Sequence, residues 1–302
     1  MAGTNVVAGP QPVEWTDEST FATTESNSAA YNWFGIGTSW SVDQGVESES
    51  ITYLPEYGSS NKLEKRVNVK LREMWEGEIT YHPQGGFSML QYWTGQDGGT
   101  SDEVPTIQIG EVNESAATEE FRRFLGGMGE EVTLSVEEDG VAEISGSFIF
   151  ADETGWSTTD YVDTSAGGSH ATEDTTIPLS YDDLSNVQWG GTDMQGAVEG
   201  IELTISNDIA EVRDPNESRG TQLTSLIPVD REITVDVTFT YENFDVLSDV
   251  RSYTKQDLTF DLGSTSFTVG DVAFPEAPYE FSPDDLVSDS LSSDPASSIS
   301  WA

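Results

Sequence analysis

The sequence predicts a mainly β protein, a sandwich or barrel with one or two short helices. Three observations support this: apolar and polar residues alternate over long stretches, tight-turn dipeptides separate several of these stretches, and helical spacing is confined to short segments. Strict alternation indicates strands with one buried face. With 302 residues, of which 35% are hydrophobic and 10% aromatic, the chain is long enough to bury a core.

The clearest strands alternate over many residues. In residues 67–81 the odd positions are mostly apolar and the even positions mostly polar, which predicts a half-buried strand bent at Gly77. Residues 233–241 repeat the pattern more cleanly. Their apolar face consists of Ile233, Val235, Val237, Phe239 and Tyr241.

Two hairpins are predicted from tight-turn dipeptides. Asp139-Gly140 separates alternating stretches at 132–136 and 141–150, and an Asp-Gly pair in this position is a strong hairpin signal. Gly263-Ser264 lies in the same way between two short alternating stretches. It suits a two-residue turn that begins with glycine.

Helical spacing occurs in three short segments. The first, with Phe87, Leu90 and Trp93 before Gly95, predicts one or two amphipathic turns. The second, residues 244–250, has the same spacing of apolar residues. In the third, residues 121–128, Gly126-Gly127 interrupts the pattern, so the residues alone leave helix and strand open.

An internal repeat organises the middle of the chain. Residues 40–46 resemble 203–209, Arg-Glu pairs precede an alternating run in both copies, and the helix-spaced segments follow in the same order. This order predicts two related strand–strand–helix halves, about 35–95 and 200–255, within one β domain of residues 31–281. Antiparallel proteins without a duplication can also show such similarities, and that alternative stays open.

Three polar segments are expected to lie outside the core. Residues 1–30 are predicted to form an N-terminal arm, residues 282–302 an acidic, Ser-rich C-terminal arm, and residues 155–195 a surface insertion. We expect the arms to be flexible, or ordered only by contact with a partner. Because the chain ends with Ile299 and Trp301, the second possibility is kept.

The charge balance excludes several classes of protein. Twelve basic residues against 55 acidic ones give a net charge of −43, which would repel nucleic acid strongly. Molar salt shortens the Debye length to about 3 Å and removes most of the self-repulsion. Because the acidic residues are spread along the chain, we predict adaptation to high salt, with an ordinary acidic mesophilic protein as the alternative.

No feature of the sequence points to catalysis, export or membrane insertion. Cysteine is absent, and so are a Gly-x-Ser-x-Gly elbow, a P-loop and a His-Glu-x-x-His motif. Ser169-His170 with Asp163 or Asp174 nearby is what chance produces in a chain rich in Ser and Asp. We therefore predict no enzyme activity, catalytic residue or cofactor, and the residues leave metal binding undetermined. The chain also lacks an export signal at its start and a run of about 20 apolar residues.

The order of these pieces resembles the major tail tube proteins of long-tailed, siphovirus-like viruses. The resemblance covers residues 35–275 or so and rests on three segments. They are Arg72-Glu73-Met-Trp-Glu-Gly77-Glu-Ile79-Thr-Tyr81-His-Pro83-Gln84 with the short helix after it, Phe121-Arg-Arg-Phe-Leu-Gly126-Gly127 with the Asp139-Gly140 hairpin, and Leu203-Thr-Ile-Ser-Asn-Asp-Ile209. The family favours a strand at 120–126. Together with the charge, the resemblance indicates a virus of a halophilic archaeon.

The resemblance implies a structural virion protein with a tail-tube-type β-sandwich or barrel. Its subunits would close into rings, commonly hexameric, that stack into a hollow tube for genome delivery. The implied partners are other copies of the chain and the tape-measure, tail-terminator and baseplate proteins, while viral DNA passes through without specific binding. The implied location is the virion tail, assembled in the host cytoplasm, with no membrane involved.

Negative lumen walls would repel phosphate groups and let a duplex slide. On the polar faces of the two repeated strands the candidates for lumen-facing residues are Glu76, Glu78, Thr234, Asp236 and Thr238. These residues could instead face solvent or a neighbouring subunit.

The alternative function is a halophilic secreted or cell-surface carbohydrate-binding β-sandwich module. It predicts an export signal and an exposed aromatic platform made by Trp156, Tyr161 and Trp189.

Overall fold

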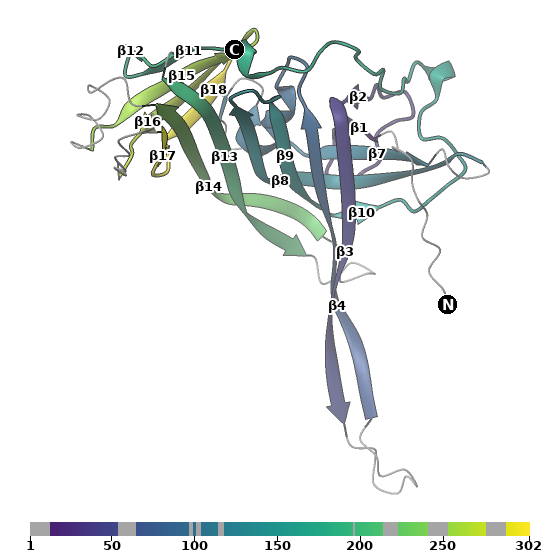
Figure 1. Ribbon diagram of the computed structural model, residues 1–302. Coiled ribbons are helices and arrows are strands. Elements are labelled where there is room, and N and C mark those ends of the chain that lie inside the picture. Colours follow the sequence, from purple (N-terminus) through teal and green to yellow (C-terminus); the bar gives the residue numbers. More distant parts are fainter. Residues whose placement is uncertain are drawn as a thin grey trace, which may run out of the picture.

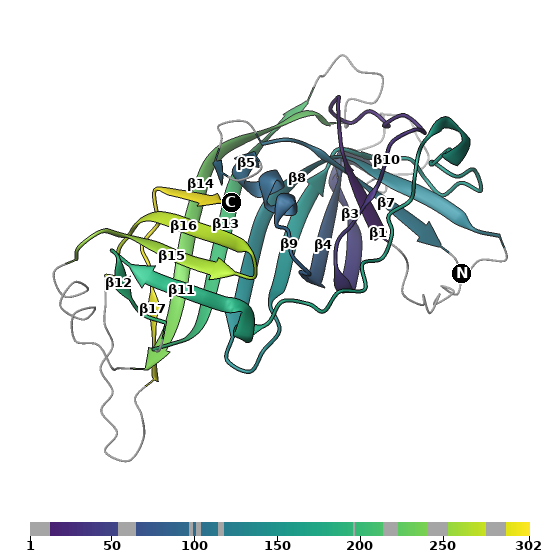
Figure 2. The same cartoon turned by 90° about the horizontal axis from the view of Figure 1, so that it is seen from above.

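In the part of the chain that the structure describes, two antiparallel β-sheets of eleven and seven strands form the body (Figures 1 and 2). The mainly β prediction is therefore confirmed. The computed structural model describes residues 13–53, 65–96, 99–100, 104–113, 118–195, 197–213, 223–240, 253–275 and 288–302.

The larger sheet contains β1 (Val13–Asp17), β2 (Asn32–Trp33), β3 (Ile36–Tyr53), β4 (Lys65–His82), β7 (Ile107–Asn113), β8 (Glu120–Glu137), β9 (Glu143–Phe150), β10 (Asp152–Glu153), β13 (Val198–Arg213), β14 (Leu223–Thr240) and β17 (Ser288–Ser292). The smaller sheet contains β5 (Gly95–Gln96), β6 (Gly99–Thr100), β11 (Leu184–Trp189), β12 (Thr192–Asp193), β15 (Gln256–Leu262), β16 (Thr265–Val272) and β18 (Ser298–Trp301). Among the described residues the helical elements are η1 (Ser88–Leu90), α1 (Gln91–Thr94), η2 (Thr164–Ala166) and η3 (Tyr181–Asp183). One apolar core joins the two sheets.

The larger sheet forks at β8. The C-terminal half of β8 pairs with β9 and β13, which gives the strand order β3-β4-β9-β8-β13-β14-β17. Its N-terminal half pairs instead with β7 and β10, and β1 and β2 continue from β7. The change occurs at Gly126, whose φ of 63° is accessible mainly to glycine.

The fork explains why residues 121–128 show helical spacing although they form a strand. Residues 124–129 are buried at six consecutive positions, because both faces of β8 are covered where the sheet divides. Alternation is lost there, and the strand that the family resemblance favoured is confirmed.

The predicted helix before Gly95 is confirmed and packs deep in the core. Tyr92 and Trp93 are completely buried, and Gly95 ends the helix with a φ of 112°. Trp93 rests on two glycines of the larger sheet: a Cβ on Gly129 would lie 2.5 Å from the indole nitrogen, and one on Gly146 would lie 2.6 Å from the ring. Only glycine leaves room for Trp93 at these positions.

Both predicted hairpins are confirmed. Asp139-Gly140 joins β8 to β9, with Asp139 at a φ of 59°, and Gly263 joins β15 to β16 at a φ of 62°. Asp and Gly tolerate this left-handed conformation better than most residues, so the turn chemistry located both loops correctly.

The prediction of terminal arms is wrong for the segments that the structure describes. Trp15 of β1 is buried and β1 pairs with β7, while β17 pairs with β14. β18 pairs with β16 and buries Ile299 and Trp301. The reason is that a few alternating apolar residues suffice to seat a short strand on an existing sheet. Residues 1–12 and 276–287 lie outside the described residues.

The predicted surface insertion is also too long. β11 belongs to the smaller sheet and pairs with β15, and Leu184, Val187 and Trp189 are buried in the core. The Gly- and Ser-rich composition of residues 155–195 hid this strand.

The repeat predicted two related halves, and two long hairpins, β3–β4 and β13–β14, do occur at those places. The two hairpins are placed differently in the sheet, however. In the first hairpin the second strand, β4, pairs with the inner strand β9, whereas in the second hairpin the first strand, β13, pairs with the inner strand β8. The repeat aligns Trp40 with Leu203 and Ile79 with Phe239. Because Trp40 pairs with Ile79, Leu203 would be expected to pair with Phe239, but Leu203 pairs with Val235. The helix expected at 244–250 lies outside the described residues.

Candidate functional site

One face of the larger sheet carries rows of polar side chains that cross its strands. Residues directly opposite each other in antiparallel strands share a face. From β3 to β14 the first row consists of Ser41, Glu78, Ser147, Glu131, Ser206 and Glu232, the second of Ser39, Thr80, Ser145, Thr133, Thr204 and Thr234, and the third, from β9 to β17, of Glu143, Ser135, Glu202, Asp236 and Ser292. We call this surface the polar sheet face; all of its charged members in these rows are acidic.

All five residues proposed for the lumen lie on the polar sheet face. Glu78, Thr234 and Asp236 belong to the rows above, Glu76 pairs with Asp43, and Thr238 pairs with Ser290. Glu76 and Glu78 are exposed, and the other three are half-buried. The fold thus brings together two segments that are far apart in the sequence.

The opposite face of the same strands packs the core, as the alternation predicted. Ile79, Tyr81, Val235, Val237 and Phe239 are buried there. Trp75 is partly buried against the same cluster. In its central region the sheet therefore has one apolar face that packs the core and one polar face.

Hydroxyl groups hold neighbouring strands of the polar sheet face together. Thr80 Oγ1 and Ser145 Oγ lie 3.2 Å apart, as do Thr133 Oγ1 and Thr204 Oγ1, and each pair shares a hydrogen bond across two strands. Hydroxyl groups of the second row therefore satisfy part of their hydrogen-bonding capacity within the row and need no basic partner.

Acidic residues are crowded on this face. Burial, then the charges of Asp236 and Glu137, raises the pKa of Glu202. Burial, then the charges of Glu76 and Glu131, raises the pKa of Glu130 next to the first row. Both shifts have the direction expected when a carboxylate has like charges as neighbours.

The polar sheet face is bounded by an apolar cluster. Met74, Met128 and Ile149 lie on the same side of β4, β8 and β9 and pack against Leu223 and Leu226 of β14. The open, polar area is thereby confined to the part of the sheet nearer the Asp139-Gly140 hairpin.

Sequence reasoning found the residues on β4 and β14 but missed those on β8, β9 and β13. Glu131, Ser147 and Glu202 complete the face, and Ser147 and Glu202 each lie between two buried neighbours in their strands. That alternation was visible in the sequence, but which strands lie side by side was not.

A second polar cluster lies away from this face and includes His170. His170 contacts Glu14 and Asp160, and it makes no hydrogen bond with Asp163 or Asp174 that would resemble a triad. Among the described residues, no group of three or more His, Asp or Glu side chains is arranged to hold a metal ion. Within the same residues, no helix is long and apolar enough to cross a membrane.

The aromatic platform required by the alternative function is not formed. Tyr161 and Trp189 are buried, and only Trp156 is exposed, at 42%. The Trp156 ring covers the guanidinium of Arg122 at 4.6 Å. Two of the three proposed sugar-stacking residues are thus core residues.

Residues 7–301 match a family model described as a phage tail tube protein. The chain belongs to the phage tail tube protein family. This membership identifies a structural component of a virion tail. No curated protein matches the chain. In this tail tube protein, the polar sheet face is the candidate functional surface.

Proposed function

We propose that this tail tube protein forms rings that stack into a hollow tube for genome delivery, with the polar sheet face lining the lumen. The observation that carries the proposal is the set of acidic and hydroxyl rows across β3, β4, β9, β8, β13 and β14. A conduit works best when its wall does not bind its cargo. Carboxylates repel DNA phosphates, and the absence of basic residues in these rows removes sites where a duplex would stick.

Ring closure is proposed to join the two edges of the larger sheet. In the described chain β3 pairs with β4 alone, and β17 covers β14 only from Asp236 onward. Val212, Ile227 and Val229 are exposed near the free part of β14, at 40%, 48% and 64%. Pairing β3 of one subunit with β14 of the next would satisfy the backbone groups of both edges and cover apolar surface. A ring, commonly hexameric in this family by resemblance, would result.

Ring stacking is proposed to use the hairpin that extends away from the body in Figure 1. The outer part of β3 pairs with the outer part of β4 from Glu47 opposite Arg72 to Tyr53 opposite Lys65. Four of the twelve basic residues of the chain lie there, namely Lys65, Arg66, Lys70 and Arg72. In a chain with a net charge of −43, this hairpin is suited to reach the acidic surface of a subunit in the next ring.

A charge-reversal experiment tests the stacking contact. Lys70→Glu with Arg72→Glu should leave the fold intact and reduce tube length, whereas Lys255→Glu, at an exposed position elsewhere, should not. Tubes of normal length from the double variant would rule out an electrostatic role for the hairpin.

The charge and the family resemblance also support a proposal for the finer setting of the protein. We propose a siphovirus-like virus of a halophilic archaeon, with the tail assembled in the host cytoplasm. Tape-measure, tail-terminator and baseplate proteins are the expected partners, and DNA is cargo rather than a ligand.

The lumen assignment is tested by placing positive charge on the polar sheet face. Glu76→Lys with Asp236→Lys should leave tubes intact but slow genome ejection, because the wall would then bind phosphate groups. The matched control is Glu173→Lys with Asp182→Lys, two exposed acids off this face. Equal ejection rates for the two double variants would place the polar sheet face elsewhere than in the lumen.

A further inference from the structure

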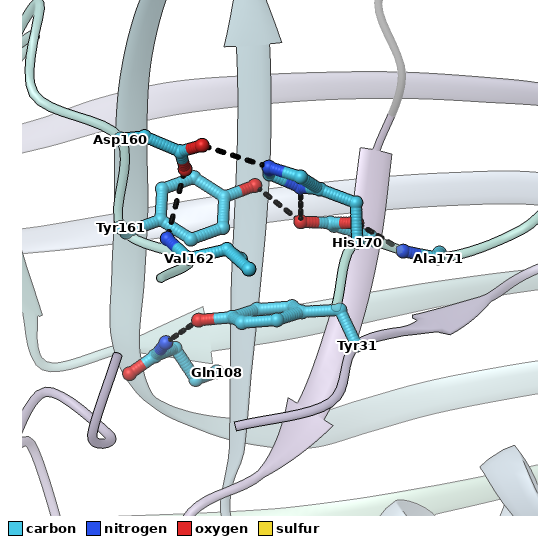
Figure 3. A network of polar contacts seen from close by, with 8 residues as sticks. Tyr31, Gln108, Asp160, Tyr161, Val162, His170 and Ala171 are labelled. Carbon is cyan, nitrogen blue, oxygen red and sulfur yellow. Dashed lines mark hydrogen bonds and ion pairs between the residues drawn. The ribbon is translucent and has the colours of Figure 1, made fainter. Parts of the chain in front are cut away.

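A buried carboxylate ties a long surface segment to the edge of the larger sheet. Glu14 of β1 is only 4% exposed. It accepts hydrogen bonds from the Tyr161 hydroxyl at 2.7 Å, the His170 Nδ1 at 2.8 Å and the Ala171 backbone nitrogen at 2.7 Å (Figure 3). We call residues 157–171 the strap, because all three donors belong to the segment that starts at Ser157 and crosses β1.

Backbone contacts hold the strap at several further points. Ser157 pairs with Phe121 at the start of β8. The Asp163 nitrogen donates to the Asn27 carbonyl at 2.7 Å, and the Tyr31 nitrogen donates to the Ser169 carbonyl at 2.9 Å. Residues 27–31 and β1 are thus covered by the same segment.

His170 bridges two carboxylates, which constrains its protonation. Its Nδ1 faces Glu14 Oε1 at 2.8 Å and its Nε2 faces Asp160 Oδ2 at 3.1 Å. An ionised carboxylate only accepts hydrogen bonds, so both ring nitrogens must carry a proton to satisfy the two contacts. A neutral imidazole has one N–H and would direct a lone pair at the other carboxylate.

The remaining groups around His170 are aromatic or acidic. The Phe121 ring stacks on the imidazole at 6.3 Å, and Tyr161 meets it edge-on at 5.6 Å. Glu119 lines the same hollow, which has a volume of about 350 Å³. The nearby cations have other partners: Arg122 pairs with Glu111 at 2.6 Å, and Arg123 lies over the Tyr161 ring and donates to the Glu25 carbonyl.

These surroundings set the direction of the pH dependence. Burial lowers the pKa of His170, but the hydrogen bonds and charges of Glu14 and Asp160 outweigh it, and the pKa of His170 is raised above its usual value. For a group whose pKa rises on folding, the added stability is complete below the unfolded-state pKa of about 6.5 and is lost as pH rises through the folded-state pKa.

We propose that His170 is a protonation-dependent latch that holds the strap closed over β1. Loss of a proton leaves one N–H for two carboxylates, so a ring lone pair then faces one of them. Where Nδ1 loses the proton, the buried Glu14 has one donor fewer, and only Tyr161, Ala171 and the backbone contacts still hold the strap to β1. The strap is closed while His170 is doubly protonated, and it loosens from β1 as pH rises through the folded-state pKa of His170.

The chain offers a clean test because it contains only two histidines. His82 Nδ1 lies 3.0 Å from the Ala142 carbonyl and has no hydrogen bond to a carboxylate among the described residues, so it serves as the internal control. The measurement is hydrogen-exchange protection of residues 157–171 in molar KCl from pH 6 to pH 9, corrected for intrinsic exchange. Wild type and His82→Gln should both lose protection as pH rises, by about tenfold for each unit by which the pKa is raised.

Two further variants and one spectroscopic readout separate the latch from a merely structural role. His170→Gln should show low, pH-independent protection of the strap, and Glu14→Gln should lower the pKa of His170. Nitrogen-15 NMR of the wild type at pH 6 should show both ring nitrogens of His170 protonated, which is the state that its two carboxylate contacts require. A neutral His170 at pH 6, or equal pH dependence in wild type and His170→Gln, would overturn the proposal. The NMR result decides the matter even if a variant fails to fold.

Discussion

At the scale of single residues, Asn207 and Arg231 explain two features of the sequence that local structure alone does not require. The Asn207 amide donates to the Trp93 carbonyl at 3.0 Å and to the Gly129 carbonyl at 2.9 Å. Arg231 donates to Asn207 Oδ1 and to the Thr94 carbonyl. The Asn of the 203–209 strand and the Arg of the Arg-Glu pair therefore join the end of α1 to β8, β13 and β14.

Replacing Asn207 by Ala should destabilise the protein strongly. The change removes the amide that donates to the carbonyl groups of the buried residues Trp93 and Gly129 and should cost about 2–4 kcal/mol. Chemical denaturation in molar KCl would measure it, with Asn32→Ala, at an exposed position, as the control. A loss no larger than that of the control would show that Asn207 does not hold α1.

Glu18 gives a second residue-scale prediction, on pH dependence. Burial raises the pKa of Glu18 to about 7, although the Gly126 and Ala22 nitrogens donate to its carboxylate. Because this pKa is raised on folding, stability should fall as pH rises from about 4.5 to about 7. In Glu18→Gln, the loss of unfolding free energy over this pH range should be smaller by an amount on the order of 3 kcal/mol. Identical stability–pH curves for the two proteins between pH 4.5 and pH 8 would contradict the assignment.

At the scale of elements, local signals located what local chemistry determines. The Asp139-Gly140 and Gly263-Ser264 turns and the helix before Gly95 depend on residues within one turn of each other, and all were predicted correctly. The polar sheet face depends on which strands are neighbours, and the His170 latch joins residues far apart in sequence. Neither the order of the strands nor the contacts of His170 follow from periodicity. The sequence therefore predicted part of the polar sheet face and none of the His170 latch.

The C-terminal strands show why composition misled. Residues 282–302 are rich in Ser and Asp, which suggested an arm, yet β18 needs only Ile299 and Trp301 on one face to join the smaller sheet. Ser300, which lies between them, points the other way in the strand alternation and is exposed.

Trp301→Ala tests this correction. Trp301 is 6% exposed, and truncating a buried tryptophan should cost about 3–5 kcal/mol. Trp156→Ala, at 42% exposure, should cost about 1 kcal/mol or less. If the two losses in unfolding free energy were equal and small, the last residues would be an arm after all.

At the scale of the whole molecule, the net charge of −43 has two consequences. Part of it lies on the polar sheet face, where we propose that it keeps the wall from binding DNA. The rest covers other surfaces and repels itself in dilute buffer, which molar salt would relieve.

The melting temperature should therefore rise with KCl. A gain of about 3–5 kcal/mol between 0.1 M and 3 M KCl would raise it by roughly 10 °C. Sucrose at matched osmolality is the control, since it does not screen charge. A melting temperature that is independent of KCl would contradict adaptation to high salt.

The most direct test of the central claim is a cryo-electron microscopy reconstruction of the protein assembled in molar KCl. We predict hollow tubes of stacked rings in which the β3–β4–β9–β8–β13–β14 sheet surrounds the channel and Glu78 and Asp236 face the axis. Strictly monomeric particles, or tubes whose channel is lined by the smaller sheet, would contradict it.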